Sequence, residues 1–314
     1  MGKKKVIPQI VKDIRKFQSK EMDWATQKLV SYSQFSIFNE CPKKWSLQYV
    51  EGQKQFTSTI HTVFGTAIHE VLQHYLTVMY EKSMVEADKI NTSEMFEDKL
   101  REEYKAQYIK NNKTHFSTPQ EIREFYEDGI EIIRDFAKNK KKHFSKRGWF
   151  LVGCEVPISL FPDIRKPNVL YQGYLDIVMY HEPTNTIKII DLKTSTRGWN
   201  DKNKKDETKQ FQLILYKKFF SEQFNFPIDN ISIEFFILKR KLQTNENFVI
   251  RRIQKFSPPS GTVKLNKATK ALDNFIENGF DNKGYKPPKH QPKLNSNCQW
   301  CVFHKTFHCS ATYT

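Results

Sequence analysis

Two aspartates and a lysine lie in apolar stretches near the middle of the chain. Asp176 lies within the apolar run 170–180, and Asp191 ends a second apolar run, 186–192, with Lys193 two positions later. The β-branched and aromatic residues of both runs, with turn residues between them, predict two strands joined by a turn. Side chains alternate faces along a strand, so Asp191 and Lys193 should point the same way. Asp176 can join them if the two strands pair.

These side chains suit the hydrolysis of a phosphodiester bond. Carboxylate oxygens hold Mg²⁺, which polarises a phosphoryl oxygen and lowers the pKa of a bound water. An ammonium group beside them can position that water or offset developing charge. The alternative is a solvated strand end, because a motif as short as Asp-x-Lys recurs by chance. However, a carboxylate is rarely left inside an apolar strand without a partner.

The sequence around these residues resembles a known nuclease family. The motif G-x-x-D ending at Asp176, followed by I-D-L-K-T at 190–194, is similar to the PD-(D/E)XK nuclease superfamily and to its RecB-type branch. That branch includes recombination nucleases, such as the AddB nuclease domain, and the CRISPR-associated adaptation exonuclease. The resemblance implies that Asp176, Asp191 and the Leu192 carbonyl bind Mg²⁺ or Mn²⁺. It also implies that Lys193 positions the attacking water.

Two expected helices bring further candidate residues. The run 64–80 has apolar residues at helical spacing, and His69 lies beside that stripe. A half-buried structural histidine is the ordinary interpretation, but the resemblance matches His69 to a metal ligand in the family's first motif. The run 208–224 predicts another helix, on which Gln212 and Tyr216 share a face. This pair resembles the Gln-x-x-x-Tyr motif of RecB-type nucleases, which implies that it positions the substrate.

Four of the five cysteines form a candidate ligand set for a metal centre: Cys41, Cys298, Cys301 and Cys309. Four thiolates can hold a cubane cluster, and the resemblance to iron–sulfur nucleases implies a [4Fe–4S] cluster that ties the two ends of the chain together. The alternative is Zn²⁺ bound by the three C-terminal cysteines with His304 or His308, which leaves Cys41 unexplained. The fifth cysteine, Cys154, is expected to be a core thiol.

Composition limits the class of protein and its partners. The 314 residues carry a formal net charge of +16, which favours polyanionic partners, nucleic acid first, although codon bias also enriches lysine. No apolar run is long enough to span a bilayer, and the first residues do not form a signal peptide. We therefore expect a cytoplasmic protein with no membrane partner. No Walker A motif is present, so no ATPase or helicase activity is inferred.

The resemblance implies an α/β fold, with a restriction-endonuclease-like core in which helices flank a mixed central sheet. Further strands are expected at 149–160, 231–238 and 248–256, and further helices within 91–142 and at 260–280. Glu155, on the first of these strands, is a candidate accessory carboxylate or an ordinary edge residue. The expected organisation is a basic arm at 1–28 and one nuclease domain at 29–314. That domain would comprise a helical part (29–148), a catalytic core (149–256) and a cysteine-bound lobe (257–314).

The leading functional hypothesis is a Mg²⁺- or Mn²⁺-dependent DNA nuclease, an exonuclease acting on single-stranded ends in recombination, repair or replication. A helicase or recombination protein is a candidate partner. A non-catalytic nucleic-acid-binding module with a zinc-knuckle-like tail is one alternative. It explains the charge and the cysteines but leaves Asp176, Asp191 and Lys193 without a purpose. A structure-specific endonuclease on the same fold is the other.

Overall fold

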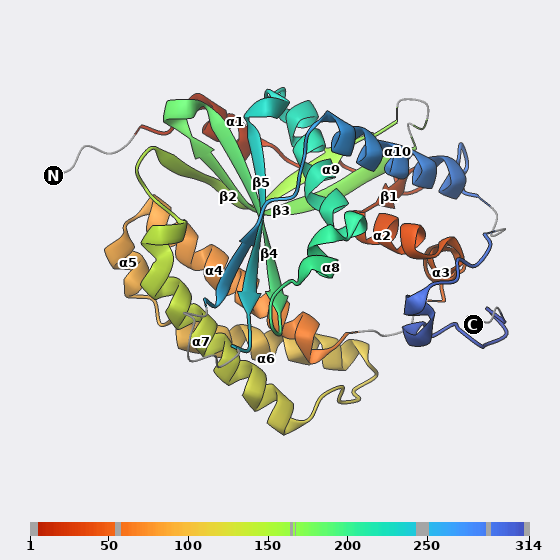
Figure 1. Ribbon diagram of the computed structural model, residues 1–314, viewed down its shortest axis with the longest axis horizontal. Coiled ribbons are helices and arrows are strands. Elements are labelled where there is room, and N and C mark those ends of the chain that lie inside the picture. Colours follow the sequence, from red (N-terminus) through yellow and green to blue (C-terminus); the bar gives the residue numbers. More distant parts are fainter. Residues whose placement is uncertain are drawn as a thin grey trace.

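The computed structural model describes residues 6–53, 58–163, 166, 168–242, 251–286 and 290–310. Within these residues, a six-stranded mixed sheet forms the centre of the molecule (Figure 1). Its strands are β1 (Lys28–Val30), β2 (Trp149–Leu160), β3 (Val169–His181), β4 (Thr186–Ser195), β5 (Ile231–Lys239) and β6 (Ile253–Phe256). Strand β3 pairs antiparallel with β2 and β4, and its first residues pair parallel with β1. Strands β4 and β5 run parallel, and β6 pairs antiparallel with β5.

Helices cover both faces of this sheet (Figure 1). On one face lie α4 (Ile60–Glu81), α5 (Met84–Asp88), α6 (Thr92–Lys110) and α7 (Pro119–His143). On the other face lie α1 (Gln9–Lys16), α2 (Tyr32–Glu40), α9 (Glu207–Phe224) and α10 (Thr262–Gly279). The shorter elements are α3 (Pro42–Trp45), a π-helical turn (Ser46–Val50), α8 (Asp201–Lys205), β7 (Phe280–Asp281), β8 (Gly284–Tyr285) and 3₁₀ turns at Glu182–Thr184, Ile228–Asn230 and Ser296–Trp300.

The sheet separates two hydrophobic cores because its central strands are apolar on both faces. On β5, Phe235 and Ile237 pack toward α9, whereas Phe236 and Leu238 pack toward α7. This double burial is typical of a strand covered by helices on both sides. The C-terminal helix α10 joins the first core, since Phe275 lies 4.9 Å, between ring centroids, from Phe38 of α2.

Most expected elements occur near their predicted positions. The helical region 91–142 divides into α6 and α7, and Pro119 begins α7 after the Thr118–Glu121 capping box. Helix α4 starts four residues before the predicted run because Thr62 Oγ1 accepts a hydrogen bond from the Thr59 N–H at 2.9 Å. Of the strand expected at 248–256, residues 248–250 lie outside the described part, and β6 begins at Ile253.

The region expected as a basic arm contains helix α1, which packs against β2. Val11 and Ile14 are buried there, and the Arg15 guanidinium donates hydrogen bonds to the carbonyls of Leu151 and Val152. The described part of this region is therefore integrated into the sheet's first core. No helix among the described residues is long and apolar enough to cross a membrane.

Candidate active site

The β3–β4 hairpin opens where the two aspartates lie. The last paired residues are Ile177 and Ile190, so Asp176 and Asp191 are the next residues along the two strands. The Asp176 carboxylate takes over part of the missing backbone pairing, because its Oδ2 accepts a hydrogen bond from the Leu192 N–H at 2.7 Å. Strand β4 continues beside β5 through Ser195, and this pairing fixes the position of Asp191.

Lys193 lies beside the buried Asp191 carboxylate. Its Nζ is 2.8 Å from Asp191 Oδ2, and the Asp191 side chain is only 4% exposed. This contact agrees with the expectation that the two side chains point the same way. Among the described residues, Lys193 is the partner of this buried oxygen, through the ion pair and a side-chain hydrogen bond. Burial lowers the pKa of Lys193, but the charges of Asp191 and Asp176 outweigh that effect and raise it.

Helix α4 brings His69 to the same place. Its Nδ1 lies 3.7 Å from Asp176 Oδ2. Burial, with a smaller contribution from the Lys193 charge, lowers the pKa of His69 to about 4. The imidazole is therefore neutral at neutral pH, which is the form that binds metal ions. One turn earlier, a Cβ built on Gly65 would lie 3.4 Å from Thr194 Oγ1, which shows how closely α4 passes the end of β4.

The cluster is short of positive charge. Burial raises the pKa of Asp176 well above its usual value, and the nearby Asp191 charge raises it further. Burial also raises the pKa of Asp191, although Lys193 opposes that shift. A buried carboxylate, Asp191, and a half-buried one, Asp176, therefore share one ammonium group beside a neutral imidazole. Oxygen donors with excess negative charge fit a divalent cation.

As the side chains stand, however, the described residues contain no group of three or more His, Cys, Asp or Glu placed to hold a metal ion. The donor types and the charge of the cluster fit a divalent cation, whereas their present spacing does not close a complete coordination sphere. A cation here would require the carboxylates and His69 to converge.

Glu155 lies directly across the ladder from Asp176, between the paired residues Cys154–Ile177 and Val156–Leu175. Its backbone has a φ of +52°, a left-handed conformation that is costly for a non-glycine residue in a strand. Gln73, one turn after His69 on α4, donates hydrogen bonds to Glu155 Oε1 at 2.6 Å and to the Asp176 carbonyl at 3.0 Å. Gln73 thus links helix α4 to both strands. From sequence, its only signal is its position four residues after His69.

Tyr216 of α9 faces the cluster from the other side of the sheet. A Cβ built on Gly173 would lie 3.1 Å from Tyr216 Cε1, so the glycine allows the ring to sit against β3. Burial raises the pKa of Tyr216, a hydrogen bond with Gln212 opposes this, and the charges of Asp191 and Asp176 add to it. Tyr216 is therefore within electrostatic reach of both aspartates, and Gln212 is its hydrogen-bond partner on α9. Tyr32 of α2, not singled out from sequence, is half-buried within reach of the Asp191 charge.

The four candidate ligand cysteines line one enclosed cavity of about 20 Å³. Two backbone N–H groups point at its sulfurs: Lys293 donates to Cys41 Sγ and Asn295 donates to Cys298 Sγ, each at 3.4 Å. His304 also lines the cavity, whereas the His308 ring lies 3.8 Å, between centroids, from Phe307. The fold thus brings Cys41 of the N-terminal region to the C-terminal lobe. The absence of a closed metal-binding group noted above applies to these cysteines as well.

Comparison with known proteins identifies the family of this chain. A family model described as the PD-(D/E)XK nuclease superfamily matches residues 29–306, which is most of the chain. The chain belongs to this superfamily. The family and the mixed sheet flanked by helices confirm the predicted fold class, and the protein is a nuclease of the PD-(D/E)XK type.

Solved structures include a distant likeness. A crystal structure of a "Putative exonuclease" from Eubacterium rectale shares 10% sequence identity with a TM-score of 0.46, covering 83% of this chain and 85% of that one. No curated protein matches the chain. The family assignment therefore rests on the sequence match.

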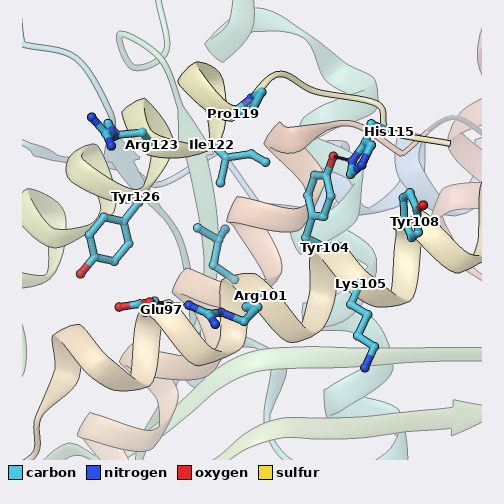
Figure 2. Close-up of a pocket in the computed structure, with 11 residues that line it drawn as sticks. Glu97, Arg101, Tyr104, Lys105, Tyr108, His115, Pro119, Ile122, Arg123 and Tyr126 are labelled. Atoms are coloured by element: carbon cyan, nitrogen blue, oxygen red, sulfur yellow. Dashed lines mark hydrogen bonds and ion pairs between the residues drawn. The ribbon is translucent and has the colours of Figure 1, made fainter. Parts of the chain in front are cut away.

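A cavity of about 530 Å³ between α6 and α7 lies apart from these residues (Figure 2). Tyrosines and charged side chains line it, and the Tyr104 hydroxyl lies 3.1 Å from His115 Nδ1. Its charges are mixed, since Arg101 pairs with Glu97 at 2.6 Å. None of the predicted site residues lines this cavity.

Proposed function

We propose that this nuclease is metal-dependent and hydrolyses phosphodiester bonds of DNA, acting as an exonuclease on single-stranded ends. One observation carries the proposal: Asp176, Asp191 and Lys193 meet where the β3–β4 hairpin opens. The contacts are the 2.7 Å bond from the Leu192 N–H to Asp176 and the 2.8 Å ion pair between Lys193 and Asp191. Such a cluster of carboxylates and an ammonium group is suited to phosphoryl chemistry.

In this proposal, His69, Asp176, Asp191 and the Leu192 carbonyl bind Mg²⁺ or Mn²⁺. Imidazole suits Mn²⁺ better than Mg²⁺, so Mn²⁺ should support the higher activity. A divalent cation held by these residues would supply Lewis-acid chemistry, polarising the scissile phosphate and lowering the pKa of the attacking water. The low pKa of His69 keeps its nitrogen free to bind a metal at neutral pH.

Lys193 orients the attacking water and offsets negative charge as it develops on the phosphate. Its ion pair with Asp191 holds the ammonium in the site before substrate arrives. Gln73 and Glu155 act as positioning residues, since the Gln73 amide ties Glu155 to the Asp176 backbone. Gln212 and Tyr216 hold the substrate strand from α9.

We further propose that the chain belongs to the RecB-type branch and works in recombination, repair or replication, with a helicase or recombination protein as partner. The order of the motifs along the sequence supports this assignment. One nuclease domain would span 29–314, with a helical part to 148 and a cysteine-bound lobe from 257. The packing of Phe275 on Phe38 and Trp45 supports a single domain, because it joins the two ends of that span.

The four cysteines lining one cavity support a thiolate-bound metal centre in the C-terminal lobe. We propose a [4Fe–4S] cluster held by Cys41, Cys298, Cys301 and Cys309, with Zn²⁺ bound by the last three and His304 as the alternative. The donors fit either metal, and the N–H groups aimed at two of the sulfurs are typical of such centres. The present cavity has room for about one water molecule, so a cubane cluster would require the sulfurs to move apart.

Colour and metal content of anaerobically purified protein separate these cases. A cluster gives a brown protein containing iron, whereas a zinc site gives a colourless protein. Cys301→Ser should lose the metal, and the matched variant Cys154→Ser should keep it. Metal-free wild-type protein with normal stability would contradict both assignments.

The proposed activity can be tested on three single-stranded DNA substrates, each with Mg²⁺ or Mn²⁺: a linear strand labelled at its 5′ end, the same strand labelled at its 3′ end, and a closed circle. An exonuclease degrades the linear strand from one end and spares the circle. Cleavage of the circle would favour the structure-specific endonuclease. Binding of all three without any cleavage would favour the non-catalytic module.

A further inference from the structure

A polar groove of about 820 Å³, here called the α8 groove, lies between α8, the start of α9, the end of α2 and the segment that precedes Cys298. Four lysines line it: Lys202, Lys205, Lys209 and Lys293. Its other lining groups are amides and hydroxyls from both sides, together with the carboxylates of Glu40 and Asp206. Figure 1 shows α8 between the end of β4 and the α2 region. The groove therefore lies between α8, the helix that follows β4, and the cysteine-bound C-terminal lobe.

Both carboxylates of the groove are already engaged. Glu40 pairs with Lys44, outside the groove lining, at 3.0 Å. Asp206 accepts hydrogen bonds from the first N–H groups of α9 and lies 3.6 Å from Lys209 Nζ. Their negative charges are thus largely compensated within the protein.

Two of the lysines are free to bind a ligand. Lys202 and Lys205 are exposed, and neither makes an ion pair within the part of the chain that the structure describes. Lys293 is different, because its Nζ donates to the Asn39 carbonyl at 2.9 Å. This hydrogen bond joins the segment before Cys298 to the end of α2. The groove therefore offers uncompensated ammonium groups among amide donors. That combination fits the phosphates of a polyanion rather than an apolar ligand.

The groove lies next to the strand that carries the proposed catalytic residues, because only residues 196–200 separate the end of β4 from the start of α8. The Tyr32 hydroxyl donates to the carbonyl of Thr208, a groove residue, at 2.5 Å. Tyr32 is half-buried, and the charges of Asp191 and of Asp206, another groove residue, both act on it. The groove is therefore placed beside the proposed site of cleavage.

We propose that the α8 groove binds the sugar–phosphate backbone of the substrate strand beside the scissile bond, with Lys202 and Lys205 contacting its phosphates. This inference rests on the proposed nuclease function and names the surface along which the substrate is held. Phosphate contacts position the strand without reading its sequence, so binding here should tolerate any base composition.

The test is binding of fluorescent dT20 in EDTA, which withholds the divalent cation, at salt concentrations between about 50 and 200 mM. Each lost phosphate contact on a single strand lowers the slope of log affinity against log salt by about 0.7. The double variant Lys202→Gln/Lys205→Gln should therefore lose a slope of about 1.4, equivalent to about a sevenfold smaller fall in affinity over this fourfold salt range.

The matched control is Lys105→Gln/Lys110→Gln, which removes the same charge from exposed positions on α6, with Lys105 at the rim of the other cavity (Figure 2). Its salt slope should equal that of wild type. Equal slopes for the groove variant and wild type would overturn the groove assignment, even if cleavage is normal. Equal losses in both double variants would also overturn it. If only the groove variant has a smaller salt slope and the wild type cleaves no substrate, the groove assignment stands and the nuclease function is rejected.

Discussion

Lys193→Met separates the proposed catalytic role of the ammonium group from its structural role. Lys193 Nζ lies 2.8 Å from a carboxylate that is 4% exposed. At an effective dielectric constant of about 20, the attraction is about 6 kcal/mol before desolvation is subtracted. Removing one partner of a buried pair costs about 3–5 kcal/mol. Because Lys193 itself is one-third exposed, we expect the variant to lose about 3 kcal/mol of stability without divalent cations.

Divalent cations should restore that stability but not the activity. A bound cation compensates the carboxylates, so urea denaturation with Mn²⁺ should bring the variant back toward wild type. Cleavage should stay low by about 10²–10³-fold, the usual cost of removing one group that stabilises charge in the transition state. Single-turnover cleavage of labelled single-stranded DNA measures this loss.

Lys188→Met is the matched control on the same strand. Lys188 Nζ pairs with Glu234 at 3.0 Å, and Glu234 keeps a second partner in Lys255 at 3.5 Å. Its loss should lower stability by less than that of Lys193 and leave cleavage unchanged. The reasoning is refuted if folded Lys193→Met cleaves within about threefold of wild type, or if Lys188→Met loses activity equally.

Three other changes test the electrostatics and packing of the described residues. Burial raises the pKa of Asp176 in the folded protein above its unfolded value of about 4. In EDTA, the contribution of Asp176 to stability is therefore fully present below about pH 4 and is lost as the pH rises through the folded-state pKa. Asp176→Asn should therefore become more stable relative to wild type toward neutral pH, and a constant difference in urea denaturation would contradict this. Gly173→Ala places a Cβ 3.1 Å from Tyr216 Cε1, which should lower stability by about 1 kcal/mol and raise KM for single-stranded DNA. An unchanged KM would show that Tyr216 takes no part in substrate binding. Arg240→Met leaves the buried Asp128 without its closest partner, which lies 2.8 Å away. The variant should lose about 3 kcal/mol of stability in urea denaturation. A loss below about 1 kcal/mol would show that Lys241 alone compensates the Asp128 charge.

Local patterns predicted the elements that carry the site. The runs of β-branched and aromatic residues at 170–180 and 186–192 correspond to β3 and β4, and the turn between them places Asn185 in the left-handed conformation that asparagine tolerates. Side chains alternate between the two faces of a strand, so residues two apart share a face. This explains why Asp191 and Lys193 meet. Helical spacing likewise predicted the helix that carries His69.

Contacts between distant segments could not be predicted in the same way. The hairpin is paired only up to Ile177 and Ile190, whereas β4 stays paired with β5 through Ser195, a parallel pairing that joins segments about forty residues apart. The left-handed backbone of Glu155 depends on the partners it finds across the sheet, and glutamate has no intrinsic preference for that conformation. The α8 groove could not be predicted from sequence either, since its lining comes from three distant segments, 36–40, 202–209 and 293–297.

The most direct test of the central claim is the cleavage of end-labelled single-stranded DNA by wild type and Asp191→Ala, with Mn²⁺ and with EDTA. Asp98→Ala, at an exposed position on α6, serves as the matched control. A single metal-dependent site predicts that wild type and Asp98→Ala release label only with Mn²⁺, while folded Asp191→Ala releases none. Equal cleavage by Asp191→Ala, or cleavage by wild type that persists in EDTA, would contradict it.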